Sequence, residues 1–313
     1  MVRRKFATLI GIVAALALAA PTAAITTGQA DNGEHPYVGE LLFYVPDARD
    51  SRFDTPGSWF TCTGTLLNST TVITAGHCTF GIGKDGVSTT NNGAITTADV
   101  GGYGGDDVWV NFNAAPNFDI LPPSKDFVPS GNEQRYLAWS AALNASHDWH
   151  RGTAYPQPQY DDNAFFLHDA GVVVLDLPVE RSNYGEAVGL NYLDKYRSAP
   201  RDTQRFEVVG YGLEKVLPKA DIGGDTRMKA EPKLDTINPR NPYIVLSNNK
   251  ATGGTCFGDS GGPTFDNTDS NLVVAVTSFG MGPNCTGIGG AYRLDQPDVQ
   301  AFLTTYGVPG VAP

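Results

Sequence analysis

Short runs of β-branched and apolar residues, separated by glycine, proline, aspartate and asparagine, make up most of the chain. Runs of this length with such boundaries are typical of β-strands connected by turns. They fall into two series along the sequence, and each series suits one β-barrel. The predicted strands cover residues 38–45, 58–67 and 71–75 in the first series, and residues 206–211, 243–247, 272–279 and 289–294 in the second.

Residues 81–165 show no regular pattern except for a short helix expected over residues 136–143. Loops longer than about 15 residues are often functional, so we expect part of this stretch to shape a binding cleft. A terminal helix is predicted after Asp295, the expected N-cap, with Pro297 in its first turn. Its apolar residues recur at helical spacing and should pack on the second barrel: Val299, Phe302, Leu303 and Tyr306.

The first 24 residues have the pattern of a secretory signal peptide. Three basic residues precede an apolar run over residues 6–20, and the small residues Ala23 and Ala24 follow. The alternative is a membrane anchor, but the run is shorter than the ~20 residues needed to span a bilayer. We therefore expect a secreted, extracellular protein with no membrane partner.

Composition supports an all-β fold, because 36 glycines and 21 prolines accompany only 18% charged residues. We expect an N-terminal barrel in residues 25–180 and a C-terminal barrel with the helix in residues 181–313. The formal net charge of −11 argues against nucleic acid as a partner, since phosphates would be repelled. Four cysteines in an exported chain indicate two disulfides with three possible pairings, and their spacing does not fit a zinc site.

One serine, Ser260, lies at the centre of a glycine-dense turn over residues 253–263. Glycines allow the positive φ angles that direct consecutive N–H groups into one space, as an oxyanion site requires. A serine nucleophile needs a general base held by a carboxylate. His77, at the end of the strand over residues 71–75, is the best-placed base, and Asp169, which opens the apolar run 170–175, is the candidate carboxylate.

These three residues and their neighbours resemble the chymotrypsin and trypsin family of serine endopeptidases. The resemblance is carried by Thr-Ala-Gly-His-Cys at 74–78, by Asp169 with its apolar strand, and by Gly-Asp-Ser-Gly-Gly-Pro at 258–263. It covers residues 25–306 apart from the long stretch before Asp169. It implies two packed antiparallel β-barrels with a C-terminal helix.

The resemblance also implies a role for each site residue. His77 takes the proton from Ser260, Asp169 orients the imidazole, and the N–H groups of Gly258 and Ser260 bind the oxyanion. It pairs Cys62 with Cys78 and Cys256 with Cys285. It implies a monomer that acts on proteins or peptides, is open to protein inhibitors, and uses no metal or other cofactor. The implied substrate-binding residues are Gly254, Thr255, Ser278, Phe279, Gly280 and Gly290.

Two finer expectations concern specificity and activation. Gly254, Gly280 and Gly290 place no carboxylate in the specificity slot, so an uncharged apolar or aromatic residue is expected before the cut. Ile25 resembles the family's mature N-terminus, whose freed ammonium would pair with Asp259 and hold the turn that aims the Gly258 N–H. Since Ile25 directly follows Ala24, export itself would produce the active end, unless a second protease trims it.

Other interpretations are weaker. The glycine-serine motif also fits an α/β-hydrolase, but that fold places its histidine after the serine, and no histidine follows His168. A protease-like binding protein would usually lack a triad member. A cation bound by His147, His150, Asp161 and Asp162 is less favoured than a solvated polar loop.

Overall fold

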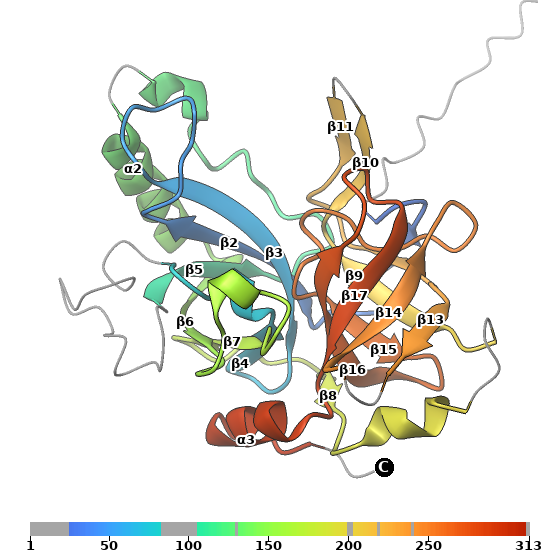
Figure 1. Ribbon diagram of the computed structural model, residues 1–313. Helices are drawn as coiled ribbons and strands as arrows, with labels where there is room; N and C mark the ends of the chain where they lie inside the picture. The colour runs from blue at the N-terminus through green and yellow to red at the C-terminus, as the bar shows by residue number, and fades with distance from the viewer. Residues whose placement is uncertain are drawn as a thin grey trace, which may run out of the picture.

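The computed structural model describes residues 25–82, 105–128, 131–198, 203–217, 220–238 and 241–310. Two β-structures lie side by side, one built from the earlier strands and one from the later strands (Figure 1). The all-β expectation is confirmed. The signal peptide predicted for residues 1–24 lies outside the described residues.

The first half is a closed six-stranded barrel in the order β2-β3-β4-β7-β6-β5, with antiparallel neighbours throughout. Val72, Ile73 and Val172 are fully buried in its core. The predicted strands match β2 to β4 closely. The bounds are β2 (Val38–Val45), β3 (Ser58–Leu66), β4 (Thr71–Thr74), β5 (Gly105–Asn111), β6 (Trp149–Pro156) and β7 (Gly171–Leu175).

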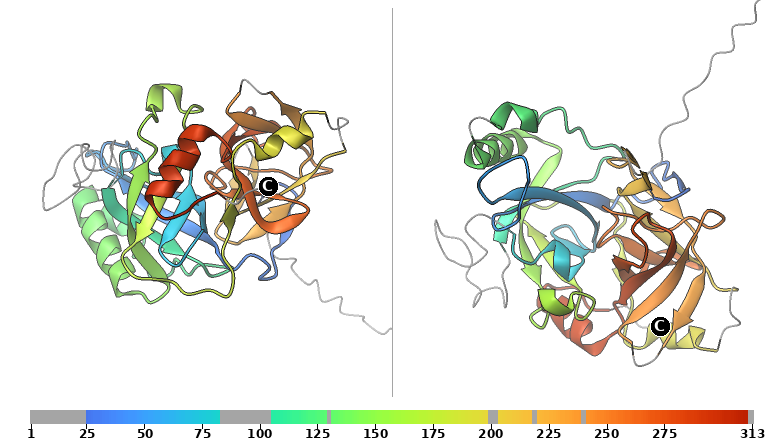
Figure 2. Two further views of the ribbon diagram at one scale, coloured as in Figure 1. Left: turned by 90° about the horizontal axis from the view of Figure 1, so that it is seen from below. Right: turned by 45° about the horizontal axis from the view of Figure 1, so that its top comes forward.

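Two of the six barrel strands, β5 and β6, lie in the stretch predicted to be irregular, so that prediction is wrong in part. Their sequences hide the strand pattern because β5 carries two aspartates, and β6 mixes histidine, arginine and glycine and ends at Pro156. Barrel pairing overrides these weak local preferences. The helix expected over residues 136–143 is confirmed as the longer α2 (Asn132–Ala145), which flanks the first barrel (Figure 2).

The second half forms one nine-stranded sheet in the order β1-β12-β9-β15-β16-β17-β14-β13, with β8 pairing parallel to β16. A separate hairpin, β10–β11, projects from it (Figure 1). The bounds are β1 (Gln29–Ala30), β8 (Glu186–Ala187), β9 (Phe206–Gly210), β10 (Leu213–Leu217), β11 (Ala220–Gly223), β12 (Met228–Ala230), β13 (Leu234–Ile237), β14 (Tyr243–Asn248), β15 (Pro263–Asp266), β16 (Asp269–Gly280) and β17 (Gly287–Arg293).

This sheet is curled, because β12 and β13, near its opposite ends, are consecutive pieces of one segment. β12 pairs with β9 at one end of the order, and β13 pairs with β14 at the other. A bridge between Arg205 and Lys233 lies at the junction. Pro232 has no amide N–H to donate, so the ladder is interrupted there and two strands are formed instead of one.

The terminal helix α3 (Pro297–Thr305), predicted to pack on the second half, also contacts the first. Its buried face includes Val299 and Phe302. Just after the helix, the ring centroid of Tyr306 lies 5.3 Å from that of Tyr155 of β6. In the view from below, α3 lies across the two halves (Figure 2). Short 3-10 helices occur at Gly76–Cys78, Ser124–Phe127, Asp162–Ala164 and Tyr192–Tyr196.

The predicted N-cap of α3 is wrong. Gln296 occupies that position and makes no side-chain cap bond. Asp295 is fully buried, and its carboxylate accepts hydrogen bonds from the Arg293 guanidinium at 2.8 Å and from the Leu193 N–H at 2.9 Å. An ion pair thus takes the carboxylate that would have capped the helix. Among the described residues, no helix has the length and apolar character required to cross a membrane.

Candidate active site

The pairing of β4 with β7 brings His77 and Asp169 together. Thr74 lies opposite Gly171 in this antiparallel ladder, so the end of one strand meets the start of the other. His77 follows in the short 3-10 helix, and the next residue, Cys78, forms a disulfide with Cys62 of β3. The base is therefore mounted on two strands and a covalent cross-link.

Asp169 has no solvent exposure, and three donors satisfy its carboxylate. His77 Nδ1 lies 3.0 and 3.1 Å from the two oxygens, and the His77 backbone N–H donates to one of them at 2.9 Å. The Ser278 hydroxyl donates to the other oxygen. These bonds compensate the cost of burying the charge and hold the imidazole in one orientation.

The electrostatics of His77 follow from this pairing. Burial by itself would lower the pKa of the imidazole, but the Asp169 charge and hydrogen bond outweigh it and raise the pKa above its ordinary value. About a quarter of the side chain remains exposed. The imidazole is thus open on one side and anchored on the other, as a proton acceptor must be.

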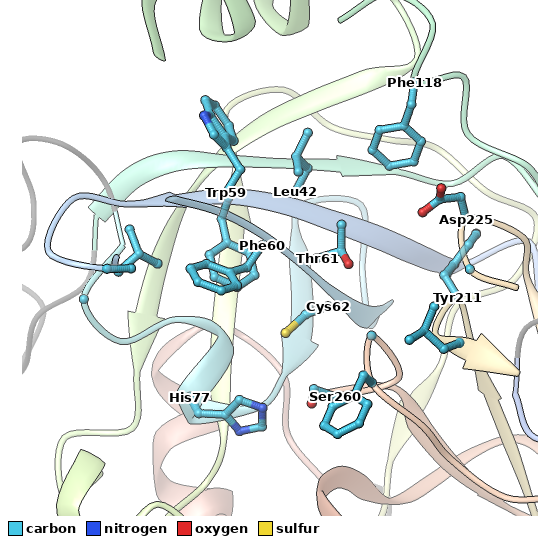
Figure 3. Close-up of a pocket in the computed structure, with 18 of the residues that line it drawn as sticks. Leu42, Trp59, Phe60, Thr61, Cys62, His77, Phe118, Tyr211, Asp225 and Ser260 are labelled. Carbon is cyan, nitrogen blue, oxygen red and sulfur yellow. The ribbon is translucent and has the colours of Figure 1, made fainter. Parts of the chain in front are cut away.

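Ser260 comes from the second half, but its turn is bonded to the first. The Thr63 N–H donates to the Ser260 carbonyl at 2.8 Å, and the Thr63 hydroxyl donates to the Gly258 carbonyl at 2.9 Å. Gly261 has a φ of 76°, and a Cβ there would overlap the Thr74 hydroxyl. The serine turn is therefore pressed onto β3 and β4, beside His77 (Figure 3).

Two backbone N–H groups near Ser260 are open. The N–H groups of Asp259, Gly261 and Gly262 all donate to carbonyl oxygens. Within the described part of the chain, the N–H groups of Gly258 and Ser260 have no such acceptor. Two open donors beside a nucleophile can stabilise an oxyanion.

The carboxylate next to the nucleophile, Asp259, is also fully buried. It accepts the Gly212 N–H at 2.8 Å and the Cys256 N–H at 2.7 Å. Burial outweighs these two bonds and raises the pKa of Asp259 to about 7. Ile25 is buried nearby, and its N–H lies 3.4 Å from the carbonyl of the same Gly212.

Two cavities meet at the Ser260 and His77 side chains. One, of about 370 Å³, continues past Thr255 and along Ser278, Phe279 and Gly280. The other, of about 1090 Å³, runs over β3 toward α2 on one side and the base of the β10–β11 hairpin on the other (Figure 3). Its walls are mostly aromatic or apolar: Leu42, Phe43, Trp59, Phe60, Phe118, Trp139 and Phe257.

Comparison with known proteins agrees with this geometry. Residues 141–296 match the family model of trypsin, which spans Asp169 and Ser260. The chain belongs to the trypsin family. As a trypsin-family member it is a serine-type endopeptidase, and the expected family and fold are confirmed. His77 lies outside the matched range, so its assignment depends on its sequence motif and on its contacts with Asp169.

Solved structures share the fold at low sequence identity. HL collagenase aligns with a TM-score of 0.58 and 16% identity, covering 90% of this chain and 98% of that one. The scabies mite inactivated protease paralogue S-D1 aligns with a TM-score of 0.54 and 13% identity, covering 91% of this chain and 99% of that one. Mouse neuropsin, a serine protease, aligns with a TM-score of 0.53 and 14% identity, covering 90% of this chain and 98% of that one. No curated protein sequence matches the chain.

The expected substrate-binding residues line two cavities that share Thr255 and Thr277. Gly280 is exposed, and a Cβ there would meet nothing within 4 Å. Gly289 faces the Thr255 hydroxyl, with its notional Cβ 3.3 Å away, whereas a Cβ on Gly290 would overlap the Phe279 ring. Both glycines border the slot, the Gly289 position facing Thr255 and the Gly290 position facing Phe279.

Both expected disulfides are present in this trypsin-family chain, since Cys256 is bonded to Cys285 as well as Cys62 to Cys78. His147, His150, Asp161 and Asp162 form no metal-binding group. Among the described residues, the one cluster of possible metal ligands is Cys62, His77 and Cys78, whose two cysteines are already bonded to each other.

Sequence reasoning missed several residues of the site. Phe165 and Phe257 line the smaller cavity and are 43% and 59% exposed. An apolar pair, Phe165 and Phe166, within a polar loop just before Asp169 was the available signal. Asn248 borders the base of the slot, and nothing in its local sequence distinguishes it from a turn residue.

Replacing Asp169 with asparagine should move the pH dependence of activity in a defined direction. The Asp169 charge raises the pKa of His77, so the acidic limb of kcat/KM should lie above pH 6.5 in the wild type. Asp169→Asn should shift this limb to lower pH and reduce kcat by roughly ten-thousandfold, because the wrong tautomer is held. Profiles of kcat/KM from pH 5 to 9 measure both effects. An unshifted limb would contradict the assignment of Asp169.

Proposed function

We propose that this protein is a secreted serine endopeptidase that cleaves proteins or peptides through an acyl-enzyme intermediate. The observation that carries the proposal is the arrangement of His77, held by the buried Asp169, beside Ser260 with two open N–H groups. We expect a monomer that protein inhibitors can block at the same cleft. No metal or other cofactor takes part in the proposed reaction.

Each step of the proposed reaction uses a side chain or backbone N–H group of this site. His77 removes the Ser260 proton as Oγ attacks the carbonyl carbon, and the N–H groups of Gly258 and Ser260 bind the oxygen as it becomes negative. The imidazolium then protonates the leaving amine, and Asp169 stabilises that cation. Water repeats the attack on the acyl-enzyme with His77 again as base.

Two cavities that both border Ser260 and extend over different segments favour an endopeptidase. A polypeptide can extend along Ser278 to Gly280 on the acyl side, where an edge segment can pair with it as an added strand. On the other side it can continue over Phe60 and Thr61 of β3. A substrate therefore need not end near the cut.

A non-catalytic binding protein is the second candidate, since the fold also occurs in human heparin binding protein and in the scabies mite inactivated protease paralogue. The contacts of Asp169 argue against it here. A buried carboxylate that accepts three bonds and aligns an imidazole is expensive to build. The open N–H groups beside Ser260 would serve no purpose in a binding module.

Specificity is proposed for an uncharged apolar or aromatic residue before the cut. The base of the slot is bordered by Gly254, Thr255, Thr277 and Gly289, and its lining has no charged side chain. A lysine or arginine would be buried there without a counter-ion. The more exposed Phe165 and Phe257 offer further apolar contact at the entrance.

Activation is proposed to depend on the N-terminus created at Ile25. Ile25 is fully buried, and Gly212 lies between it and Asp259. The Gly212 carbonyl accepts the Ile25 N–H, and the Gly212 N–H donates to the Asp259 carboxylate. Cleavage before Ile25 would therefore create an ammonium close to the Asp259 carboxylate, which has two N–H donors but no ion-pair partner among the described residues. Removal of residues 1–24 during secretion would create it.

Ser260→Ala should abolish turnover without unfolding the protein. Loss of the nucleophile should cost roughly a millionfold in kcat, and adding His77→Ala should cost little more because the triad acts as a unit. Hydrolysis of casein and of a chromogenic peptide, with the unfolding temperature as control, measures this. Wild-type turnover in Ser260→Ala would refute the proposed mechanism.

Cleavage of a peptide library should show uncharged apolar or aromatic residues before the cut. The expected preference over arginine and lysine is roughly a hundredfold in kcat/KM, because a cation would be desolvated without a partner. Mass spectrometry of the products gives the cut sites. Dominant cleavage after arginine or lysine would overturn this specificity.

The effect of Asp259 on the folding stability of the protein should depend on whether residues 1–24 are attached to Ile25. In the chain with residues 1–24 attached, the pKa of Asp259 is about 7, above its unfolded value near 4, so folding stability is lost as pH rises between these values. The loss is on the order of 4 kcal/mol. In a chain that begins at Ile25, an ammonium partner should lower this pKa and remove most of the loss.

Urea unfolding of both chains from pH 4 to 8, with Asp259→Asn as control, tests the coupling. The asparagine variant should lack the pH-dependent loss in either chain. Identical pH profiles and identical kcat in the two wild-type chains would show that Asp259 does not need the ammonium.

A further inference from the structure

Asn248, the last residue of β14, carries a buried hydrogen-bond acceptor at the base of the specificity slot. Only 3% of the residue is exposed. Its Nδ2 donates to the Thr255 carbonyl at 2.5 Å, while its Oδ1 has no partner in the described part of the chain. Buried polar atoms are nearly always paired, so an unpaired one within a binding pocket indicates a group that a ligand can satisfy.

The orientation of this amide is fixed by its other half. If the side chain were turned over, Oδ1 would face the Thr255 carbonyl and two acceptors would meet. The oxygen is therefore directed away from Thr255. A Cβ on Gly254 would overlap it, so the Asn248 carbonyl occupies the place that a side chain at position 254 would take.

Asn248 and the reacting serine border two cavities that share two wall residues. Asn248 borders a small cavity of about 10 Å³ together with Gly254, Thr255 and Thr277. Thr255 and Thr277 also line the 370 Å³ cavity that contains Ser260. A substrate side chain that enters from Ser260 between Thr255 and Thr277 would therefore be directed toward Asn248.

We propose that Asn248 Oδ1 selects substrates whose residue before the cut ends in an uncharged hydrogen-bond donor, with tyrosine ahead of phenylalanine. The inference rests on the proposed function and narrows its specificity. A tyrosine hydroxyl would donate to Oδ1, whereas phenylalanine would leave this buried acceptor unpaired. A cation gains less, because the neutral carbonyl does not compensate its desolvation.

Three peptide substrates that differ only in the residue before the cut test this with the wild-type enzyme. They carry tyrosine, phenylalanine and 4-methylphenylalanine, the last matching the shape of tyrosine without its donor. We expect kcat/KM for tyrosine to exceed that for both others by roughly tenfold or more, as for sites built to bond a substrate hydroxyl. Equal or higher kcat/KM for phenylalanine would overturn the inference.

Variants at Asn248 give an independent readout. Asn248→Leu should reduce the ratio of tyrosine to phenylalanine to about one, because it keeps the volume and removes the acceptor. Asn248→Asp should add cleavage after arginine and lysine, since a carboxylate would then face the slot. The matched control is Asn267→Asp, which adds the same charge in the exposed turn between β15 and β16 and should leave both specificities unchanged.

The outcomes separate this inference from the function on which it rests. If the wild type cleaves none of the peptides and Ser260→Ala gives the same result, the proposed function fails. If the wild type cleaves them without preferring tyrosine, only the role of Asn248 fails. Should the Asn248 variants not fold, the three wild-type substrates still decide the question.

Discussion

Asp259 is the constraint around which the catalytic half of the molecule is arranged. Its buried carboxylate accepts N–H groups from Gly212, after β9, and from Cys256, before the nucleophile. The space around it is so restricted that a Cβ on Gly210 would overlap the carboxylate, and one on Gly212 would lie 2.6 Å from the Asp259 nitrogen. The turn that presents Ser260 therefore has its shape because a carboxylate fills the space below it.

The remaining geometry comes from bonds between the two halves. Thr63 of β3 binds both the Ser260 and Gly258 carbonyls, and the Thr74 hydroxyl donates to the Thr63 carbonyl at 2.8 Å. The nucleophile is thus located by the same strands that support His77. Since neither half contains a complete site, the relative position of the halves is part of the chemistry.

Local sequence was sufficient where one short segment determines the structure. The strand before His77, the apolar strand after Asp169 and the glycine turn around Ser260 each carry their own signal, and these segments appear where they were expected. β5 and β6 could not be found in this way, because their polar residues become strand only by pairing in the barrel. The prediction that Asp295 caps the helix was wrong because its carboxylate pairs with Arg293 at the end of β17, and no local sequence pattern indicates this ion pair.

The slot shows a second limit on prediction from sequence. Gly289 and Gly290 are adjacent and identical, and which of them faces Thr255 depends on the pairing of β17 with β16, whose register shifts between Thr277 and Phe279. A change of one residue in register reverses the facing of every side chain that follows. The position of Asn248 at the slot could not be predicted for a related reason. It depends on how β14 packs beside the slot, and Asn248 lies outside the catalytic motifs.

The long excursion that carries α2 begins and ends at one pair of the barrel ladder. Asn111, at the end of β5, pairs with Trp149, at the start of β6, so the ladder is complete before the excursion begins. Its closure entropy depends only weakly on its length. The six-stranded ladder is therefore closed without the excursion. The first residues of the excursion instead tie the two halves together, because the Asn113 carbonyl accepts the Tyr211 hydroxyl and the Ala114 carbonyl accepts the Arg227 N–H.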